Sequence, residues 1–165
     1  MKQAEHKALR TLDQLLNDVL WPTSNPPHDR RHFALEYVLC RIPEADYRRL
    51  ADAIDTFCWF IPPAWKRASI ELLPATYEKA FSNGPPSRGA RVVYFSPSLE
   101  RTPGDILYAI VAHELAHVVL NHKLQTATLE EYDVQEEEAL RCICGWGFKR
   151  EAMRHKANKR RHGLT

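Results

Sequence analysis

One apolar run, ILYAIVAHELAHVVLNH at 106–122, constrains the fold of this chain more than any other feature. Apolar residues occur on almost every side of its helical wheel, which predicts a helix buried at the centre of a domain. Thr102 is the expected N-cap, with Pro103 at the first helical position and Asp105 in the first turn. The helix is expected to run to about residue 122.

The size and composition of the chain favour a single globular domain around this helix. It has 165 residues, 44% hydrophobic and 27% charged, with a net charge of +2 that favours neither a dedicated nucleic-acid binder nor a membrane-surface protein. No apolar run approaches the roughly 20 residues that span a bilayer, and the N-terminal residues show no secretory signal. The four cysteines are expected to be reduced thiols. These features predict a cytoplasmic protein with no membrane association.

Patterns on either side of the apolar run predict an α+β fold dominated by helices, with a small sheet. Helices are expected at 4–20, 29–41, 44–60, 75–81 and about 132–144, and strands at 69–73 and 91–96. We expect one domain at 1–148, made of a helical N-terminal part (1–90) and a metal-site core (91–148). Residues 149–165 are expected to form a basic C-terminal tail.

Residues 113–117 form the motif His-Glu-Leu-Ala-His, an HExxH pattern. His113 and His117 lie one helical turn apart on the same face, so their imidazoles can bind one ion at about 2 Å each. Glu114 lies about 100° round the helix, where its carboxylate can take a proton from a metal-bound water. A surface helix carrying these residues by coincidence is disfavoured, since the flanking AIVA and VVL are not surface sequence. We therefore predict one Zn²⁺ per chain, with Glu114 as the general base.

The third zinc ligand has to come from elsewhere, because a catalytic zinc ion usually has three protein ligands. On the predicted helix 132–144, Glu136 shares the apolar face that is expected to turn inward. Glu136 is therefore the first candidate and Glu137 the second. Glu137 and Glu138 are expected to point to solvent or to nearby Lys or Arg.

Other residues near the motif have weaker claims to the metal. His122 points away from His113 unless the helix ends first, and a histidine meeting the helix dipole is the favoured interpretation. Cys142 and Cys144 face different directions on a helix, so we interpret them as partly buried thiols. Four residues are candidates for oxyanion stabilisation: Tyr94, Tyr108, Tyr132 and His122.

The segments HELAHVVLNH and EEEALRCICGWGF together resemble the small zinc metallopeptidases of the gluzincin type. In that family the HExxH motif supplies two ligands and a Glu on a later helix, often in Glu-x-x-Ala-Asp, supplies the third. The resemblance implies a zincin-like domain with His113, His117 and Glu136 as ligands, although thermolysin-like spacing would select Glu137. Leu140 occupies the Asp position, so support for the ligand histidines must come from elsewhere. ImmA/IrrE-type peptidases and SprT-like proteases share the HExxH helix.

These features predict a zinc metallopeptidase that hydrolyses peptide or protein substrates, in which Glu114 also passes the proton to the leaving amine. The alternative is a non-catalytic regulatory or interaction protein that retains a zinc site. In that case the basic residues of 149–162 would contact nucleic acid or an acidic partner, although a solvated terminal helix is the favoured interpretation of this segment. Glu114 favours the enzyme, because a purely structural site needs no general base.

Overall fold

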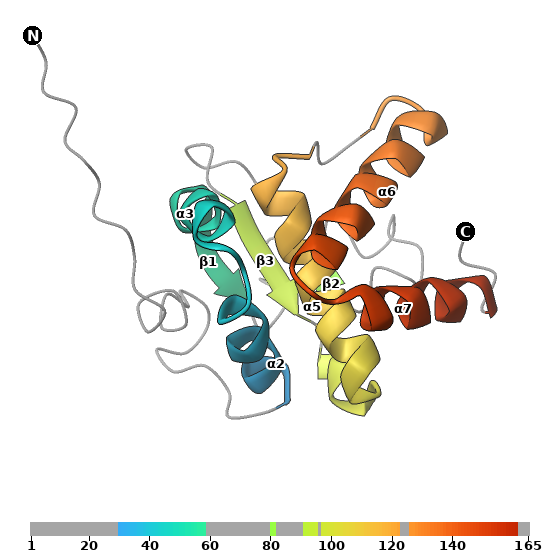
Figure 1. Cartoon of the computed structure of the whole chain (residues 1–165), viewed down its shortest axis with the longest axis horizontal. Coiled ribbons are helices and arrows are strands. Elements are labelled where there is room, and N and C mark those ends of the chain that lie inside the picture. Colours follow the sequence, from blue (N-terminus) through green and yellow to red (C-terminus); the bar gives the residue numbers. More distant parts are fainter. Residues whose placement is uncertain (1–29, 59–79, 82–90, 96, 123–125, 162–165) are drawn as a thin grey trace, which may run out of the picture.

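The computed structural model describes residues 30–58, 80–81, 91–95, 97–122 and 126–161 (Figure 1). Helices dominate these residues, as predicted. The predicted helix 4–20, the predicted strand 69–73 and residues 75–79 lie outside the described part. The elements, in chain order, are α2 (Arg30–Leu39), α3 (Glu44–Ala53), β1 (Ile54–Cys58), β2 (Ala80–Phe81), β3 (Arg91–Phe95), the 3-10 helix η2 (Pro97–Arg101), α5 (Gly104–Val119), α6 (Leu129–Gly145) and α7 (Lys149–Arg161).

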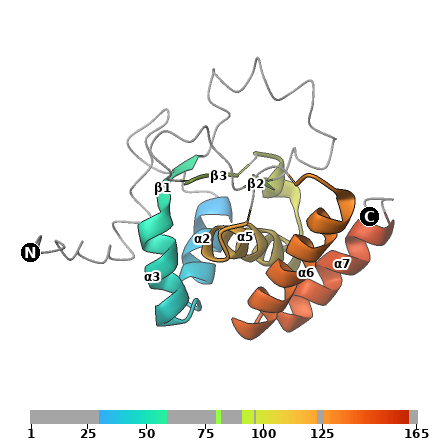
Figure 2. The ribbon, with the colours of Figure 1, turned by 90° about the horizontal axis from the view of Figure 1, so that it is seen from above.

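The described strands form one sheet with the order β1-β3-β2, in which β1 is parallel to β3 and β2 is antiparallel to it. Figure 2 shows the sheet as one layer with the helices on one side of it. Val93 and Phe95 of β3 are fully buried. Because alternate residues of a strand share a face, these two side chains lie on the same face of β3.

Helix α5 is the centre of the molecule, as its apolar pattern predicted. Ten of its 16 residues are buried, including His113. It contacts α2 and α3 on one side, α6 and α7 on the other, and β2 and β3 of the sheet (Figure 2). Other elements therefore surround most of the circumference of α5. The HExxH residues occupy one part of that circumference.

The start of α5 differs by one residue from the prediction. Pro103, not Thr102, is the N-cap, and the helix begins at Gly104. Pro103 has a ψ of 142°, which is an extended value, so it stands outside the first turn. Proline fixes φ but leaves ψ free, which is why its presence did not decide between the two positions. Asp105 lies in the first turn, as expected.

The end of α5 comes three residues earlier than predicted, at Val119. Asn121 takes a left-handed conformation with φ of 54°. The backbone N–H groups of Asn121 and His122 then donate to the carbonyl oxygens of Val118 and His117, both at 3.0 Å. This is the Schellman pattern of helix termination, and it turns the chain back along the helix.

Strands replace parts of two predicted helices, and the helix predictions are wrong at those residues. Residues 54–58 form β1, so the helix expected at 44–60 ends at Ala53. Residues 80–81 form β2, where the end of the helix 75–81 was expected. Both strands pair with β3, which begins more than thirty residues after the end of β1. Strand formation depends on such pairing more than on local preference, so the helical spacing around residue 54 misled the prediction.

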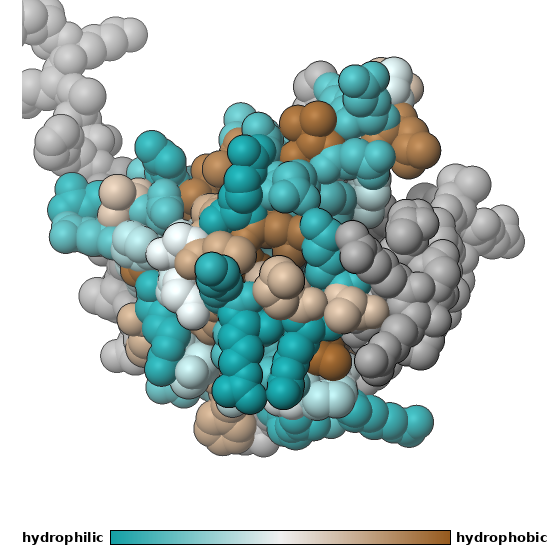
Figure 3. Space-filling model, turned by 45° about the vertical axis from the view of Figure 1, so that its right-hand side comes forward, coloured by the Kyte–Doolittle hydropathy of each residue, from teal (hydrophilic) through white to brown (hydrophobic). Residues whose placement is uncertain are grey.

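Helix α7 packs against α5 and α6. Ala152 and His155 are buried, and Arg154 forms an ion pair with Asp105 of α5. The basic segment therefore forms a packed helix over residues 149–161. In Figure 3 the molecular face that carries α6 and α7 is largely hydrophilic, with smaller hydrophobic areas between. Among the described residues, no helix is long and apolar enough to cross a bilayer.

Candidate metal centre

Two histidines on adjacent turns of α5 point the same way. His113 and His117 are four residues apart, and their Nε2 atoms lie 3.0 Å from each other. The side chain of His113 is 4% exposed and that of His117 is 14% exposed. The buried ring of His155 lies beside His113, with the ring centroids 5.9 Å apart. The pair is therefore held by packing and opens toward solvent on the His117 side.

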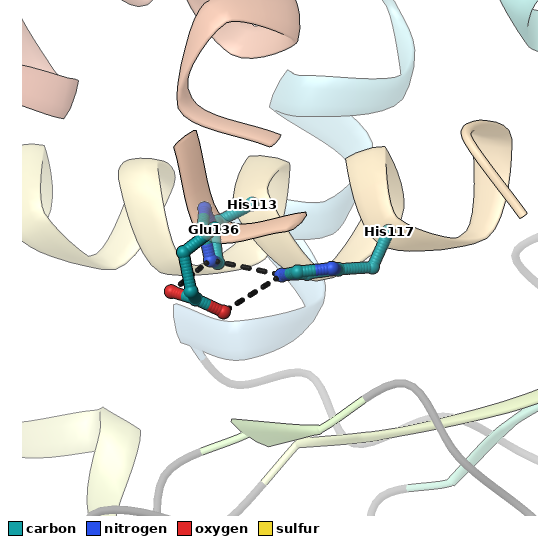
Figure 4. A group of neighbouring side chains, drawn as sticks. All are labelled: His113, His117 and Glu136. Carbon is teal, nitrogen blue, oxygen red and sulfur yellow. Dashed lines mark hydrogen bonds and ion pairs between the residues drawn. The ribbon is translucent and has the colours of Figure 1, made fainter. Parts of the chain in front are cut away.

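Glu136 reaches the two histidines from α6 (Figure 4). Its Oε2 lies 3.1 Å from Nε2 of His113, and its Oε1 lies 3.3 Å from Nε2 of His117. Each carboxylate oxygen thus faces one imidazole. The Glu136 side chain is 20% exposed. The sequence pattern placed this residue on the inward face of its helix, and the structure brings it to the HExxH histidines.

The three side chains fit a metal ion. Their ligand atoms all lie within 4.8 Å of one another. Tetrahedral zinc with bonds of about 2.0–2.1 Å holds its ligand atoms about 3.3 Å apart, close to the separations observed here. Two imidazoles and one carboxylate are also the donor set of several catalytic zinc sites, which keep a further position for water or substrate. The partial exposure of His117 and Glu136 is consistent with such an open position.

The sequence around α6 explains how Glu136 is aimed. Thr128 caps the helix by accepting a hydrogen bond from the backbone N–H of Glu131 at 3.1 Å, so α6 begins three residues before the prediction. Ala139 and Ile143 are its buried residues. They follow Glu136 by three and seven positions, which places all three on one helical face. Burying that face against the molecule turns the Glu136 carboxylate inward.

A hydrogen bond at the other end of α6 holds it in place. The indole Nε1 of Trp146 donates to Oδ2 of Asp46 on α3 at 2.9 Å.

Gly147 follows with φ of 94°, and the backbone N–H groups of Gly147 and Phe148 donate to the carbonyl oxygens of Cys144 and Ile143. Glycine adopts such a φ without strain, so the chain can leave α6 and enter α7 directly.

The two other glutamates of the triplet have different partners. Glu137 lies 3.4 Å from Nζ of Lys156, which agrees with the expectation of a nearby basic residue. Glu138 is exposed, as expected, but its contact is with a histidine and not with a Lys or Arg. Its Oε2 lies 3.1 Å from Nε2 of His122. The cause is the early end of α5, which turns His122 back toward α6.

His122 occupies a position that the sequence interpretation missed. It is 7% exposed, and its Nδ1 lies 2.8 Å from Nδ1 of His117. His122 therefore does not point away from the motif, although it lies outside the group of three possible ligands that the described residues form. The signal that could have located it was Asn121, since asparagine enters the left-handed region more readily than most residues and can end a helix there.

The remaining candidates have these positions. Glu114 is half-buried on α5, and Tyr132 is half-buried on α6. Tyr108 stacks on Tyr37 of α2, with ring centroids 4.3 Å apart. The side chain of Tyr94 lies outside the described part of the structure. Cys142 and Cys144 are free and half-buried, as interpreted from their spacing.

An HExxH helix joined by a glutamate from a following helix is the arrangement of a metallopeptidase centre. Residues 60–161, more than half of the chain, match the model of peptidase family M48. The chain belongs to peptidase family M48, and it is therefore a metallopeptidase by family. No curated protein and no solved structure matches the chain.

The family match covers more of the chain than the stretch that carried the resemblance. It begins before β2 and extends through α7, whereas the two segments that carried the resemblance lie within 113–148. The prediction of a metallopeptidase is confirmed at the level of the family. The match does not support the narrower likeness to ImmA/IrrE-type or SprT-like proteins.

Proposed function

We propose that this protein is a zinc-dependent peptidase with a zincin-like domain, in which His113, His117 and Glu136 hold one zinc ion. The observation that carries the proposal is the convergence of two imidazole nitrogens and a carboxylate at separations of 3.0–3.3 Å. Side chains from two helices meet at these distances in a site that is only partly exposed. This arrangement suits a cation that needs three protein ligands.

A zinc ion in this site supplies a Lewis acid that polarises a carbonyl and makes an attacking water more acidic. Glu114 directly follows His113 on α5, so its carboxylate starts from the same turn of helix as a ligand. In the proposed mechanism Glu114 takes a proton from the attacking water and then donates it to the leaving amine. His113, His117 and Glu136 keep their positions throughout, because all three are held by packed helices.

The substrate class we propose is a peptide or protein, and the proposed location is the cytoplasm. The alternative of a non-catalytic protein that retains a zinc site is not favoured by membership of a peptidase family. A structural zinc site is usually closed by four protein ligands. Here the ligand-forming group among the described residues comprises three.

The test is the variant Glu114→Gln, compared with the wild type in zinc content and in turnover of casein or a peptide library. We expect it to retain zinc and to lose hydrolysis by at least about 10²-fold, the usual scale for loss of an acid–base group. Glu130→Gln, an exposed position on α6, is the matched control and should keep full activity. Equal turnover by Glu114→Gln and the wild type would contradict the assignment of the base. Zinc binding without turnover by the wild type would favour the non-catalytic alternative.

A further inference from the structure

His117, His122 and Glu138 form a continuous line of polar contacts that leads away from the metal centre. Nδ1 of His117 lies 2.8 Å from Nδ1 of His122, and Nε2 of His122 lies 3.1 Å from Oε2 of Glu138. Both distances are within hydrogen-bond range. The line passes from the inside of the molecule to its surface, since His122 is 7% exposed and the Glu138 side chain is 45% exposed.

The positions of the protons on this line follow from the number of hydrogen-bond donors and acceptors that each side chain has. A neutral imidazole has one N–H donor and one acceptor nitrogen. Nε2 of His117 faces His113 and Glu136, so it must offer its lone pair if it binds an ion. The proton of His117 then resides on Nδ1 and is donated to Nδ1 of His122. His122 consequently carries its own proton on Nε2, where the Glu138 carboxylate accepts it.

The opposite tautomer of His122 does not fit this arrangement. It would place two N–H groups face to face at a nitrogen–nitrogen distance of 2.8 Å. The negative charge of Glu138 favours the proton on Nε2 of His122, because a carboxylate can only accept hydrogen bonds. Glu138 therefore selects the tautomer of His122, and His122 in turn selects that of His117.

We propose that Glu138 and His122 are positioning residues that fix His117 with its Nε2 lone pair toward the metal site. This inference rests on the proposed zinc binding and adds a role for two residues that are not ligands. Histidine ligands commonly donate their second N–H to a carboxylate, which orients the ring and makes the ligand nitrogen more basic. Here the carboxylate acts through an intervening imidazole.

The local fold is built to hold this line. The left-handed Asn121 ends α5, and the backbone N–H of His122 donates to the carbonyl oxygen of His117 at 3.0 Å. His122 is thus linked to His117 both by a backbone hydrogen bond and by the contact between their rings. Glu138 lies two positions after Glu136 on α6, so the same helix supplies a ligand to the site and the last acceptor of the line.

The test measures zinc affinity by competition with a chromophoric chelator, in full-length protein whose folding is checked by circular dichroism. We expect Glu138→Ala to weaken zinc binding by about 10- to 100-fold, the usual cost of removing such a partner. Glu138→Gln, whose amide oxygen still accepts a hydrogen bond, should recover part of this loss. Glu137→Ala is the matched control, because Glu137 contacts Lys156 and should bind zinc as the wild type does.

A spectroscopic measurement separates positioning from general stabilisation. In ¹⁵N-labelled, zinc-loaded protein, imidazole nitrogen shifts should show His117 protonated on Nδ1 and His122 protonated on Nε2. In zinc-free protein, Glu138→Ala should leave His122 as a mixture of tautomers, because neither a bound ion nor the carboxylate then selects one. A His122 protonated on Nδ1 in the wild type, or equal zinc affinity in Glu138→Ala and Glu137→Ala, would overturn the proposal.

The outcomes also distinguish this inference from the proposed function. Zinc binding that is insensitive to Glu138 removes the positioning role and leaves the peptidase intact. Zinc binding that depends on Glu138, in a protein that hydrolyses no peptide, supports the positioning role and removes the peptidase. A wild type that binds no zinc overturns both. His122→Phe removes the imidazole between His117 and Glu138 and so tests the contact in the middle of the line. If His122→Phe fails to fold, the zinc affinity of Glu138→Ala still tests the proposal.

Discussion

Oε2 of Glu136 lies 3.1 Å from Nε2 of His113, although the two residues are 23 positions apart and belong to different helices. Their meeting depends on how α6 packs against α5. A carboxylate beside two imidazoles at this distance implies a shared proton or cation. The candidate metal centre therefore depends on helix packing, and a variant that disturbs the packing of α6 against α5 should also disturb this site.

Purified protein should contain about one zinc ion per chain, and His113→Ala or His117→Ala should lose it, because two protein ligands seldom hold zinc tightly. Binding to the folded state alone should also stabilise the wild type by about 2.7 kcal/mol at free zinc of 100 times Kd. Elemental analysis and thermal unfolding with and without chelator measure both effects. A chelator-sensitive Tm in His113→Ala would speak against this site.

Glu136→Ala should weaken zinc binding strongly, whereas Glu137→Ala should have little effect. The reason is the orientation of α6, which turns Glu136 to the histidines and Glu137 to Lys156. Glu136→Gln preserves volume and removes the charge, so it should also bind zinc more weakly than the wild type. Chelator competition on the three variants measures the order, and a reversed order for positions 136 and 137 would show that the helix is rotated.

Asp46→Ala should destabilise the fold by about 1–3 kcal/mol, because it leaves the indole N–H of the buried Trp146 without its acceptor. Asp46 also pairs with the exposed Arg49 at 3.5 Å. Arg49→Ala is therefore the control, and it should cost no more than about 1 kcal/mol, the scale of an exposed ion pair. Urea unfolding followed by circular dichroism measures both variants. Equal losses would mean that the hydrogen bond to Trp146 contributes little.

Cys142 should react slowly with iodoacetamide at pH 8, and the exposed Cys40 should react faster. Burial, with a contribution from the nearby charge of Asp46, raises the pKa of the Cys142 thiol to about 11. Thiolate is the reactive form, and little of it exists well below the pKa. Peptide mapping by mass spectrometry over a time course measures the two rates separately.

The same pKa predicts the pH dependence of stability. The folded-state pKa is above the ordinary value of 9.0, so the unfolded chain releases this proton first. Stability should therefore fall as pH rises from about 9 towards 11. Cys142→Ala should lack this part of the decline in urea unfolding measured across that range.

Several features of the fold could be read from local patterns, and others could not. The buried helix α5 was predictable, because apolar residues surround it on almost every side. β1 was not, since its hydrogen bonds come from β3, more than thirty residues away. The buried Arg31 was equally invisible, because its guanidinium donates to the carbonyl oxygen of Phe95 at 2.8 Å, a partner that only the packed chain provides.

The amino-acid sequence by itself determined the geometry that lies within single helices. The four-residue spacing of His113 and His117 sets their rings on one face, and periodicity puts Glu136 on the buried side of α6, because helical geometry is the same wherever a helix forms. Only the tertiary structure decided which helices meet and where the chain turns. The left-handed Asn121 and the packing of α6 brought His122 to His117 and Glu138 to His122, through contacts that no periodic pattern encodes.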